Sequence, residues 1–185
     1  RRVELCFRAW LRSVPQCMER GPISRSDVSG AGAQAEIRRV LVDDPEALAL
    51  LEAYFAELRD RLGAFDPPTR RELRADAEHG VTLLCSEDGR AVGCGSLRRL
   101  DGATAEVKRM FVAASARGRG HARRLLRALE DEAATAGCTR VVLDTAAPLH
   151  EAAGLYLQDG YAEVERYNDT PFAARWFEKR LGAAH

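Results

Sequence analysis

The chain has 185 residues, and its 28 basic and 28 acidic side chains give a formal net charge of zero. This length suits one compact domain with a sizeable core, and the balanced charge argues against a general nucleic-acid or membrane-surface binder, which would carry a basic excess. The five cysteines are odd in number and show no Cys-x-x-Cys spacing. That usage is typical of a reduced, cytoplasmic chain with buried thiols and no metal.

The first 34 residues differ from the rest in composition. Residues 1–18 mix Arg, Cys and Trp without a clear period, and residues 21–34 are rich in Gly, Ser and Ala. We expect residues 1–34 to be a flexible N-terminal extension and residues 35–182 to be the folded domain. A transit peptide is the alternative interpretation of the extension, although Glu4 and Pro15 do not suit one.

The folded part is predicted to begin with a strand and a helix. The strand covers residues 36–42, and Asp43 with Glu46 resembles a capping box, with Pro45 in the first turn of the helix. This helix is predicted to run to Leu62, because one apolar stripe follows it, made of Leu48, Leu51, Phe55, Leu58 and Leu62.

A second helix and three strands follow. Thr69 and Glu72 have capping-box spacing for a more polar helix that ends near Glu78. Two Asp-Gly pairs, at 88–89 and 101–102, are strong hairpin signals. They predict an antiparallel meander of three strands, over residues 81–86, 91–100 and 104–112.

The next helix, from Gly120 to Ala136, carries its charges in the reverse of the favoured order. Its apolar residues recur at helical spacing, as Ala122, Leu125, Leu126, Leu129, Ala133 and Ala136. Basic residues crowd its start and acidic residues its end, which opposes the helix dipole unless an anion lies among the free N–H groups of the first turn. Gly118 and Gly120 allow close approach of the backbone. The segment therefore predicts a phosphate-binding loop.

The remainder predicts a parallel strand over residues 139–145, a helix over 149–158 and two closing strands over 162–167 and 175–181. The fold class is thus α/β (α+β), with a mixed central sheet of about six or seven strands. In this sheet an antiparallel meander leads through a β-α-β crossover to a parallel strand.

Two motifs identify the type of phosphate loop. The loop is neither a P-loop, since no Gly-Lys-Ser/Thr occurs, nor a dinucleotide fingerprint, which needs a third glycine. The run Arg117-x-x-Gly120-x-Ala122 instead resembles the pyrophosphate loop of the GNAT (Gcn5-related N-acetyltransferase) superfamily. The segment 153–161, Ala-Gly-Leu-Tyr-Leu-Gln-Asp-Gly-Tyr, resembles that family's Ala-x-x-Leu-Tyr-x-x-x-Gly-Phe signature. The resemblance covers about residues 35–181 and implies splayed parallel strands with helices on both faces.

The resemblance implies acetyl-CoA as co-substrate. Backbone N–H groups of the loop would hold its pyrophosphate with help from arginines, and N–H groups beside Phe111 and Val112 would polarise the thioester. The predicted cofactor-binding residues are Phe111, Val112, Arg117, Gly118, Arg119, Gly120, His121, Ala122 and Arg123.

Two residues are predicted to move protons. Tyr156 occupies the family's tyrosine position, and a phenol with a pKa near 10 can protonate the departing CoA thiolate. Glu106, at the head of the strand that leads to the thioester, is a candidate base for the acceptor amine. His150 and His79 are alternative bases.

The acceptor site is predicted at Tyr54, Phe65, Tyr167 and Asn168, where family analogy places it. The sequence then favours an enzyme that acetylates a small-molecule or peptide amine, as a monomer or a homodimer, with no nucleic-acid or membrane partner. Two alternatives stay open: a non-catalytic acyl-CoA-binding sensor, and an acetyltransferase acting on a protein N-terminus or lysine.

Overall fold

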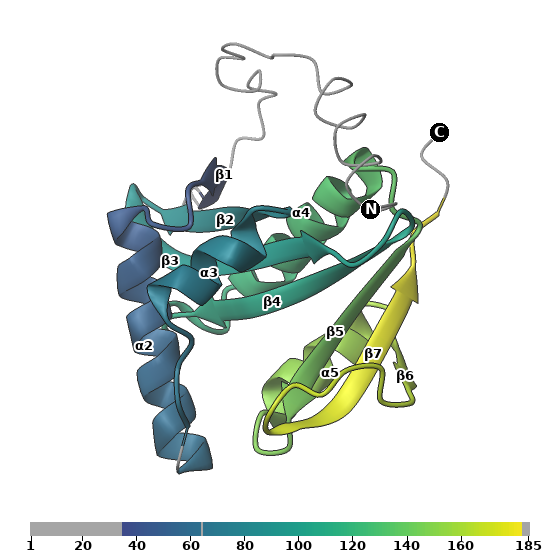
Figure 1. The fold of residues 1–185 in the computed structure, drawn as a ribbon. Helices are drawn as coiled ribbons and strands as arrows, with labels where there is room; N and C mark the ends of the chain where they lie inside the picture. Colours follow the sequence, from purple (N-terminus) through teal and green to yellow (C-terminus); the bar gives the residue numbers. More distant parts are fainter. Residues whose placement is uncertain (1–34, 64, 183–185) are drawn as a thin grey trace. The chain divides into compact units, whose positions relative to one another are not determined.

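The computed structural model describes residues 35–63 and 65–182 (Figure 1), so the expectation for residues 1–34 lies outside the described part. Within that part, seven strands form one mixed sheet in the order β1-β2-β3-β4-β5-β7-β6. The predicted fold class is confirmed. The strands are β1 (Ala35–Val40), β2 (Gly80–Glu87), β3 (Arg90–Arg99), β4 (Thr104–Val112), β5 (Arg140–Ala146), β6 (Ala162–Val164) and β7 (Ala173–Arg180).

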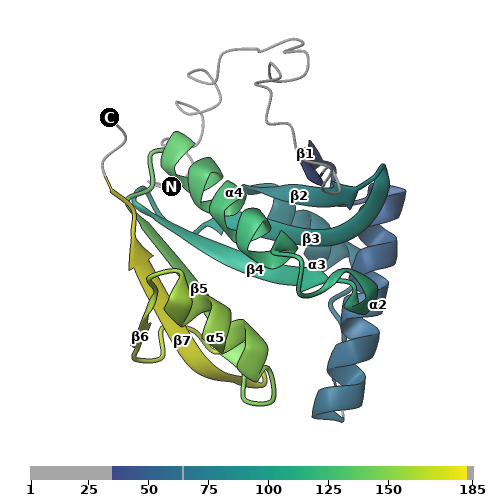
Figure 2. The ribbon, with the colours of Figure 1, turned by 180° about the vertical axis from the view of Figure 1, so that it is seen from behind.

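Helices cover both faces of the sheet (Figures 1 and 2). Helices α2 (Pro45–Leu62) and α3 (Arg70–Ala77) lie on one face, while α4 (His121–Thr135) lies on the other, followed in the chain by α5 (His150–Gln158). Side chains of β2 alternate between the two faces: Leu83 and Cys85 join the core beneath α4, and Leu84 joins the core beneath α2. No helix among the described residues has the length and apolarity that crossing a bilayer requires.

The start of α2 corrects one sequence prediction. Asp44, not Asp43, caps the helix, since its carboxylate accepts hydrogen bonds from the backbone N–H groups of Glu46 and Ala47. Asp43 instead pairs with Arg74, at 3.0 Å. The predicted stripe is also shifted, because Ala47 and Leu50 are buried while Leu48 and Leu62 are half-buried. The capping box of Thr69 and Glu72 is present as predicted.

The meander depends on its turns. Asp88 and Gly89 both have positive φ, 51° and 77°, as a type I′ hairpin turn requires. At the next turn the Asp101 carboxylate accepts hydrogen bonds from the N–H groups of Ala103 and Thr104, at 2.7 and 2.8 Å. These two turns place β4 in the middle of the sheet.

Strands β4 and β5 are parallel neighbours for only a short distance. They pair from Thr104↔Arg140 to Glu106↔Val142 and then separate, as the wedge between their ribbons shows (Figures 1 and 2). On its other edge β5 pairs with β7 along its full length. Strand β6 is shorter than the predicted 162–167, because it pairs with β7 only through Val164.

Strand β4 also contains a bulge opposite β3. Ser96 pairs with Lys108 and Cys94 with Phe111, so Gly95 faces two residues, Arg109 and Met110. Arg109 takes a positive φ of 54°. A bulge leaves part of the ladder unpaired and re-aims the neighbouring side chains, here at the point where β4 leaves β5.

The packing of α4 on the sheet predicts a stability effect. Leu129 is fully buried under α4, whereas Leu157 on α5 is 48% exposed. Leu129→Ala should lower the free energy of unfolding by about 2–5 kcal/mol, through lost burial and the cavity left behind. Leu157→Ala, the same chemical change, should alter it by less than about 1 kcal/mol. Urea unfolding measures both, and equal losses would contradict this account of the core.

Candidate active site

A cavity of about 650 Å³ lies in the wedge between β4 and β5. Its walls are largely apolar and aromatic, and they come from α2, α5 and the segments that precede α3 and β7. Its charged side chains are Lys108 and Arg109 from β4, Asp144 from β5, and Asp66 and Glu72 just before and at the start of α3. An apolar cavity with a few convergent polar groups is the usual form of a small-molecule site.

Tyr156 lines this cavity from α5. Its ring packs in the core against Tyr161 and Phe177, with centroids 5.9 and 5.6 Å away. The Tyr156 hydroxyl donates a hydrogen bond to no residue that the structure describes, and it is not fully buried. Burial, with the nearby Tyr54 and the charge of Asp144, raises the pKa of Tyr156 above its ordinary value. The phenol therefore keeps its proton throughout the physiological pH range.

Glu106 lies beneath the cavity, with no exposed surface, and is not among the lining residues. One carboxylate oxygen, Oε2, accepts a hydrogen bond from Arg98 Nε at 2.6 Å. The other, Oε1, accepts from the Tyr167 hydroxyl at 3.1 Å and from Asn168 Nδ2 at 3.0 Å. Both oxygens of the predicted base are therefore already engaged with protein donors.

Asp144 lies at the cavity surface beside Glu106. Its Oδ2 accepts from Asn168 Nδ2 at 2.7 Å and from the Thr170 hydroxyl at 3.1 Å. Lys108 Nζ lies 3.5 Å from Asp144 Oδ2 and 3.6 Å from Glu106 Oε1, between the two carboxylates. Asn168 thus bridges the two acids through one amide nitrogen.

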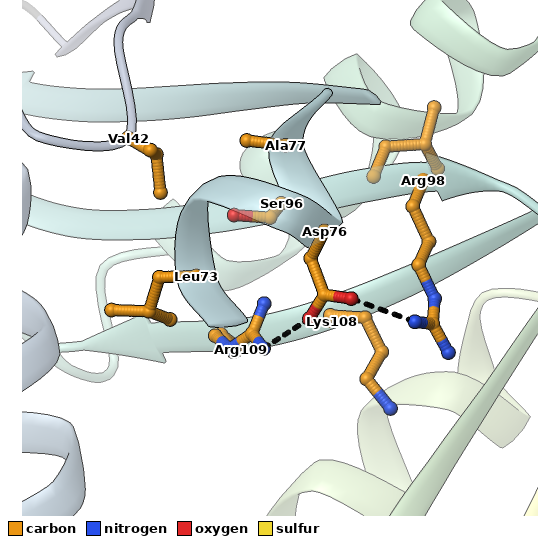
Figure 3. Close-up of a pocket in the computed structure, with 9 residues that line it drawn as sticks. Val42, Leu73, Asp76, Ala77, Ser96, Arg98, Lys108 and Arg109 are labelled. Atoms are coloured by element: carbon orange, nitrogen blue, oxygen red, sulfur yellow. Dashed lines mark hydrogen bonds and ion pairs between the residues drawn. The ribbon is translucent and has the colours of Figure 1, made fainter. Parts of the chain in front are cut away.

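The cluster continues to α3 on the other side of Glu106. Asp76 pairs with Arg109 and with Arg98 Nη1, the latter at 2.8 Å. Figure 3 shows the Asp76 carboxylate between these two guanidinium groups, with Lys108 pointing away from it. Burial alone would raise the pKa of Asp76, but the hydrogen bond and charge of Arg109, joined by Arg98, lower it.

The predicted phosphate loop has the backbone of an anion site. Gly118 and Gly120 both adopt positive φ, 77° and 82°, and a Cβ at either would meet no atom within 4 Å. Gly120 caps α4 without a side-chain hydrogen bond, and no acidic residue lies in the first turn. The first N–H groups of α4 therefore have no side-chain acceptor and are available to an anion.

The loop arginines are held by acidic partners. Arg117 pairs with Glu57 of α2 and donates to the Val112 carbonyl at 2.9 Å. Arg119 pairs with Glu87, and Arg123 pairs with Asp159 at 3.2 Å. These pairs hold the loop against α2, β2 and the end of α5, and they engage guanidinium groups that a phosphate would otherwise contact.

The side chain of His121, predicted to bind the cofactor, is buried in the core. Its imidazole is 2% exposed, with Nε2 3.0 Å from Glu87 Oε1 and Nδ1 3.8 Å from Cys85 Sγ. Position 121 precedes Leu125 and Leu129 by four and eight residues, so the side chain lies on the core stripe of α4. Only its backbone N–H can face an anion, and the same holds for the alanine that follows.

The predicted acceptor residues fall into two groups. Tyr54 and Phe65 line the cavity, and Phe65 lies 6.0 Å from Phe172 of the β6–β7 loop, measured between ring centroids. Burial, followed by the charge of Asp144, raises the pKa of Tyr54 to about 12. Tyr167 and Asn168 instead contact Glu106 below the cavity. Neither alternative base, His79 or His150, is among the residues lining the cavity.

Sequence reasoning missed Lys108 and Asp144. The signal for Asp144 was present, because an acid stands inside the β-branched run of residues 141–145 that was predicted as a buried strand. An ionisable side chain in such a strand needs a partner or a function. The partners lie 24 and 36 residues away, at Asn168 and Lys108.

Comparison with known proteins establishes the class. The model of the acetyltransferase (GNAT) family matches residues 46–161, more than half of the chain. The protein belongs to this family.

Individual relatives agree with that assignment. Over 82 residues the chain is 40% identical to an IAA acetyltransferase of Azospirillum brasilense, a match that spans 44% of this chain and only 54% of that protein. It is 29% identical over 157 residues to glucosamine 6-phosphate N-acetyltransferase 1 of Oryza sativa subsp. japonica, covering 77% of this chain and 92% of that one. A GNAT family acetyltransferase from Elizabethkingia anophelis, solved with acetyl-CoA bound, shares the fold at a TM-score of 0.62 and 17% identity, over 80% of this chain and 98% of the other.

The loop geometry predicts the effect of charge at position 120. Any side chain there meets the strain of a positive φ, about 1–2 kcal/mol, so Gly120→Ala measures strain alone. Gly120→Glu adds a carboxylate at the helix N-terminus, in competition with a phosphate. It should weaken CoA binding at least about tenfold beyond Gly120→Ala, the loss expected for one charge-assisted hydrogen bond. Calorimetric titration measures both, and equal affinities in the two variants would argue against an anion site here.

Proposed function

We propose that the protein transfers an acetyl group from acetyl-CoA to the amine of a small molecule or peptide, directly and without an acetyl-enzyme intermediate. One observation carries the proposal: the wedge between β4 and β5 holds a cavity of about 650 Å³ into which an unbonded tyrosine hydroxyl and a carboxylate both open. An acid and a base that line one cavity suit a transfer in which sulfur gains a proton and nitrogen loses one.

The loop from Arg117 to Arg123 would hold the pyrophosphate of acetyl-CoA. The free N–H groups at the start of α4 and the open space at Gly118 and Gly120 support this role. Phe111 and Val112, at the end of β4 just beyond the bulge, would bring backbone donors to the thioester oxygen. The chain leads directly from this strand end into the loop, so one continuous segment would contact both the thioester and the pyrophosphate of the co-substrate.

Tyr156 would be the acid that protonates the leaving thiolate. Its raised pKa does not weaken this role, because a thiolate formed in the same apolar cavity is destabilised by the same loss of solvent. The proton transfer therefore depends on the difference in free energy between the Tyr156 phenolate and the CoA thiolate inside the cavity. Because the acid form persists above pH 10, turnover should show no alkaline loss from Tyr156 below that pH.

The acceptor is an amine that enters by way of Tyr54 and Phe65. The two named relatives above act on different acceptors, so the family alone does not select one. The general base is one of the carboxylates of the cluster; Glu106 was the candidate in the sequence, and its hydrogen bonds link it to Asp144 through Asn168.

Replacing the acid tests this proposal. Tyr156→Phe keeps the ring and its packing but removes the proton, so kcat should fall about 10²-fold or more while CoA affinity stays unchanged. Release of CoA thiol from acetyl-CoA is measured in the presence of a panel of amines. Tyr161→Phe removes the hydroxyl of the neighbouring buried tyrosine, which does not line the cavity, and should keep wild-type turnover.

Two results would contradict the proposal. Equal turnover in wild type and Tyr156→Phe would make Tyr156 a packing residue. Tight acetyl-CoA binding without thiol release in any amine would instead identify a non-catalytic sensor.

A further inference from the structure

We propose that Asp144 is the residue that binds the acceptor's ammonium group and takes its proton, while Glu106 and Asn168 hold Asp144 in position. This inference rests on the proposed acetyl transfer and specifies its acceptor side. It moves the general base from Glu106 of β4, which the sequence indicated, to Asp144 of β5 across the wedge.

The two carboxylate oxygens of Asp144 have different surroundings. Asn168, Thr170 and Lys108 all contact Oδ2. No residue in the described ranges donates a hydrogen bond to Oδ1, and this oxygen is not fully buried. Since Asp144 lines the cavity, this oxygen is a carboxylate acceptor open to whatever enters.

Glu106 has no such open oxygen. That carboxylate is fully buried, outside the cavity lining, and bonded to Arg98, Tyr167 and Asn168. To accept a proton it would have to break these hydrogen bonds, and no acceptor amine can reach it. Its contacts instead fit a support for the loop that carries Asn168.

Asn168 is held at both ends of its side-chain amide. Its Nδ2 donates to both acids, and its Oδ1 accepts from the Trp176 indole N–H at 2.9 Å. The amide therefore cannot rotate without losing partners. Because the Asn168 amide bonds only to Oδ2 of Asp144, it keeps Oδ1 of Asp144 directed toward the cavity.

Charge in the cluster is balanced before an acceptor arrives. Three acids (Asp76, Glu106 and Asp144) are matched by three bases (Arg98, Lys108 and Arg109). The titratable groups that contact Asp144 or feel its charge are Lys108 and Glu106 from β4, Tyr54 from α2, Tyr156 from α5 and Tyr167 from the β6–β7 loop, and Arg109, Asp66 and Glu72 line the same cavity. The negative charge of Asp144 raises the pKa of all three tyrosines, so it is felt across the whole cavity.

The walls indicate the rest of the acceptor. Aromatic side chains line the same cavity as the carboxylate: Tyr54, Tyr156, and Phe65 with Phe172, whose rings pack against each other. An ammonium group on an apolar or aromatic body would satisfy both Asp144 and these walls. An acceptor with its own carboxylate would bring a negative charge toward Asp144 and should be disfavoured.

The proposed transfer moves two protons from the acceptor nitrogen. The ammonium R–NH3+ gives one proton to Asp144 Oδ1, which later passes it to water. The resulting amine attacks the thioester carbon, a C–N bond forms, and the C–S bond then breaks with the thiolate taking the proton of Tyr156. The nitrogen loses its second proton, which restores Tyr156. The sum is one amide, one CoA thiol and one released proton.

The test compares Asp144→Asn with wild type across pH, using 2-phenylethylamine as acceptor and L-glutamate as its anionic counterpart. Asparagine keeps the shape and accepts the same hydrogen bonds but cannot take a proton. At neutral pH its kcat/KM should be at least about 10²-fold lower, with unchanged CoA affinity. Wild-type kcat/KM should be flat while Asp144 is ionised and the amine is protonated. The variant should rise about tenfold per pH unit up to the amine pKa near 10, because only neutral amine reacts.

Matched variants separate catalysis from positioning. Asp131→Asn makes the same change on the exposed side of α4 and should behave as wild type. Glu106→Gln should lower kcat/KM yet keep the flat profile, since Asp144 still takes the proton. Thr170→Val removes one bond to Oδ2 and should cost about three- to tenfold, whereas Thr170→Ser should not. If Asp144→Asn does not fold, the comparison of Thr170→Val with Thr170→Ser tests the role of Asp144.

The outcomes distinguish this inference from the proposed function. Absence of thiol release by wild type with every amine tested would refute the proposed function. Wild-type turnover combined with an unchanged rate in Asp144→Asn, or a slow variant whose profile stays flat, would refute the assignment of Asp144 alone. A steep profile in Glu106→Gln with a flat one in Asp144→Asn would return the base to Glu106, and preference for L-glutamate over 2-phenylethylamine would refute the acceptor class.

Discussion

The short pairing of β4 with β5 is the constraint on which the site depends. The two strands share ladder hydrogen bonds only from Thr104 to Glu106 and from Arg140 to Val142, and beyond that point each must find other partners. Strand β5 finds β7 on its far edge, while β4 keeps β3 and absorbs the change of direction in a bulge at Arg109 and Met110. The groups facing the wedge are left to a ligand, which is why a cavity lies at this point in a core that is otherwise closely packed.

The wedge is supported on its inner side by charge rather than by apolar packing. Six ionised side chains, three of each sign, connect α3, β3, β4 and β5, and the β6–β7 loop joins them through Asn168. Burying so many charges is costly unless each is paired and hydrogen-bonded, and in this cluster each has at least one partner of opposite sign. Such a network resists rearrangement, because moving one member leaves another charge buried alone. Such a polar network next to the cavity suits the proposed transfer, in which two protons leave one nitrogen.

Much of the fold could be predicted from the sequence, since its signals are local. The two Asp-Gly turns indicated where β2 ends, where β3 begins and ends and where β4 begins, and the periodicity of Leu125, Leu126 and Leu129 predicted α4 to within a residue or two at each end. The errors are also local: the cap of α2 is one residue later than predicted, and β6 ends early because loop side chains turn toward Glu106. The roles of Lys108 and Asp144 could not be predicted in this way. They depend on how far two strands separate and on which loop closes the gap, and neither leaves a period in the sequence. His121 could have been placed correctly, because its spacing to Leu125 already put it on the buried stripe.

The most direct measurement is a crystal structure with a non-hydrolysable acetyl-CoA analogue, in which a methylene group separates the acetyl carbonyl from sulfur. We expect its pyrophosphate to lie against the backbone N–H groups of residues 118–123 and its acetyl group to lie inside the wedge. We also expect that the sulfur lies within hydrogen-bonding reach of the Tyr156 hydroxyl, and that space for one amine remains between the carbonyl carbon and Asp144 Oδ1, about 3–3.5 Å from each. An analogue bound outside the wedge, or an acetyl group with Asp144 on its far side and Glu106 exposed to it, would contradict the account.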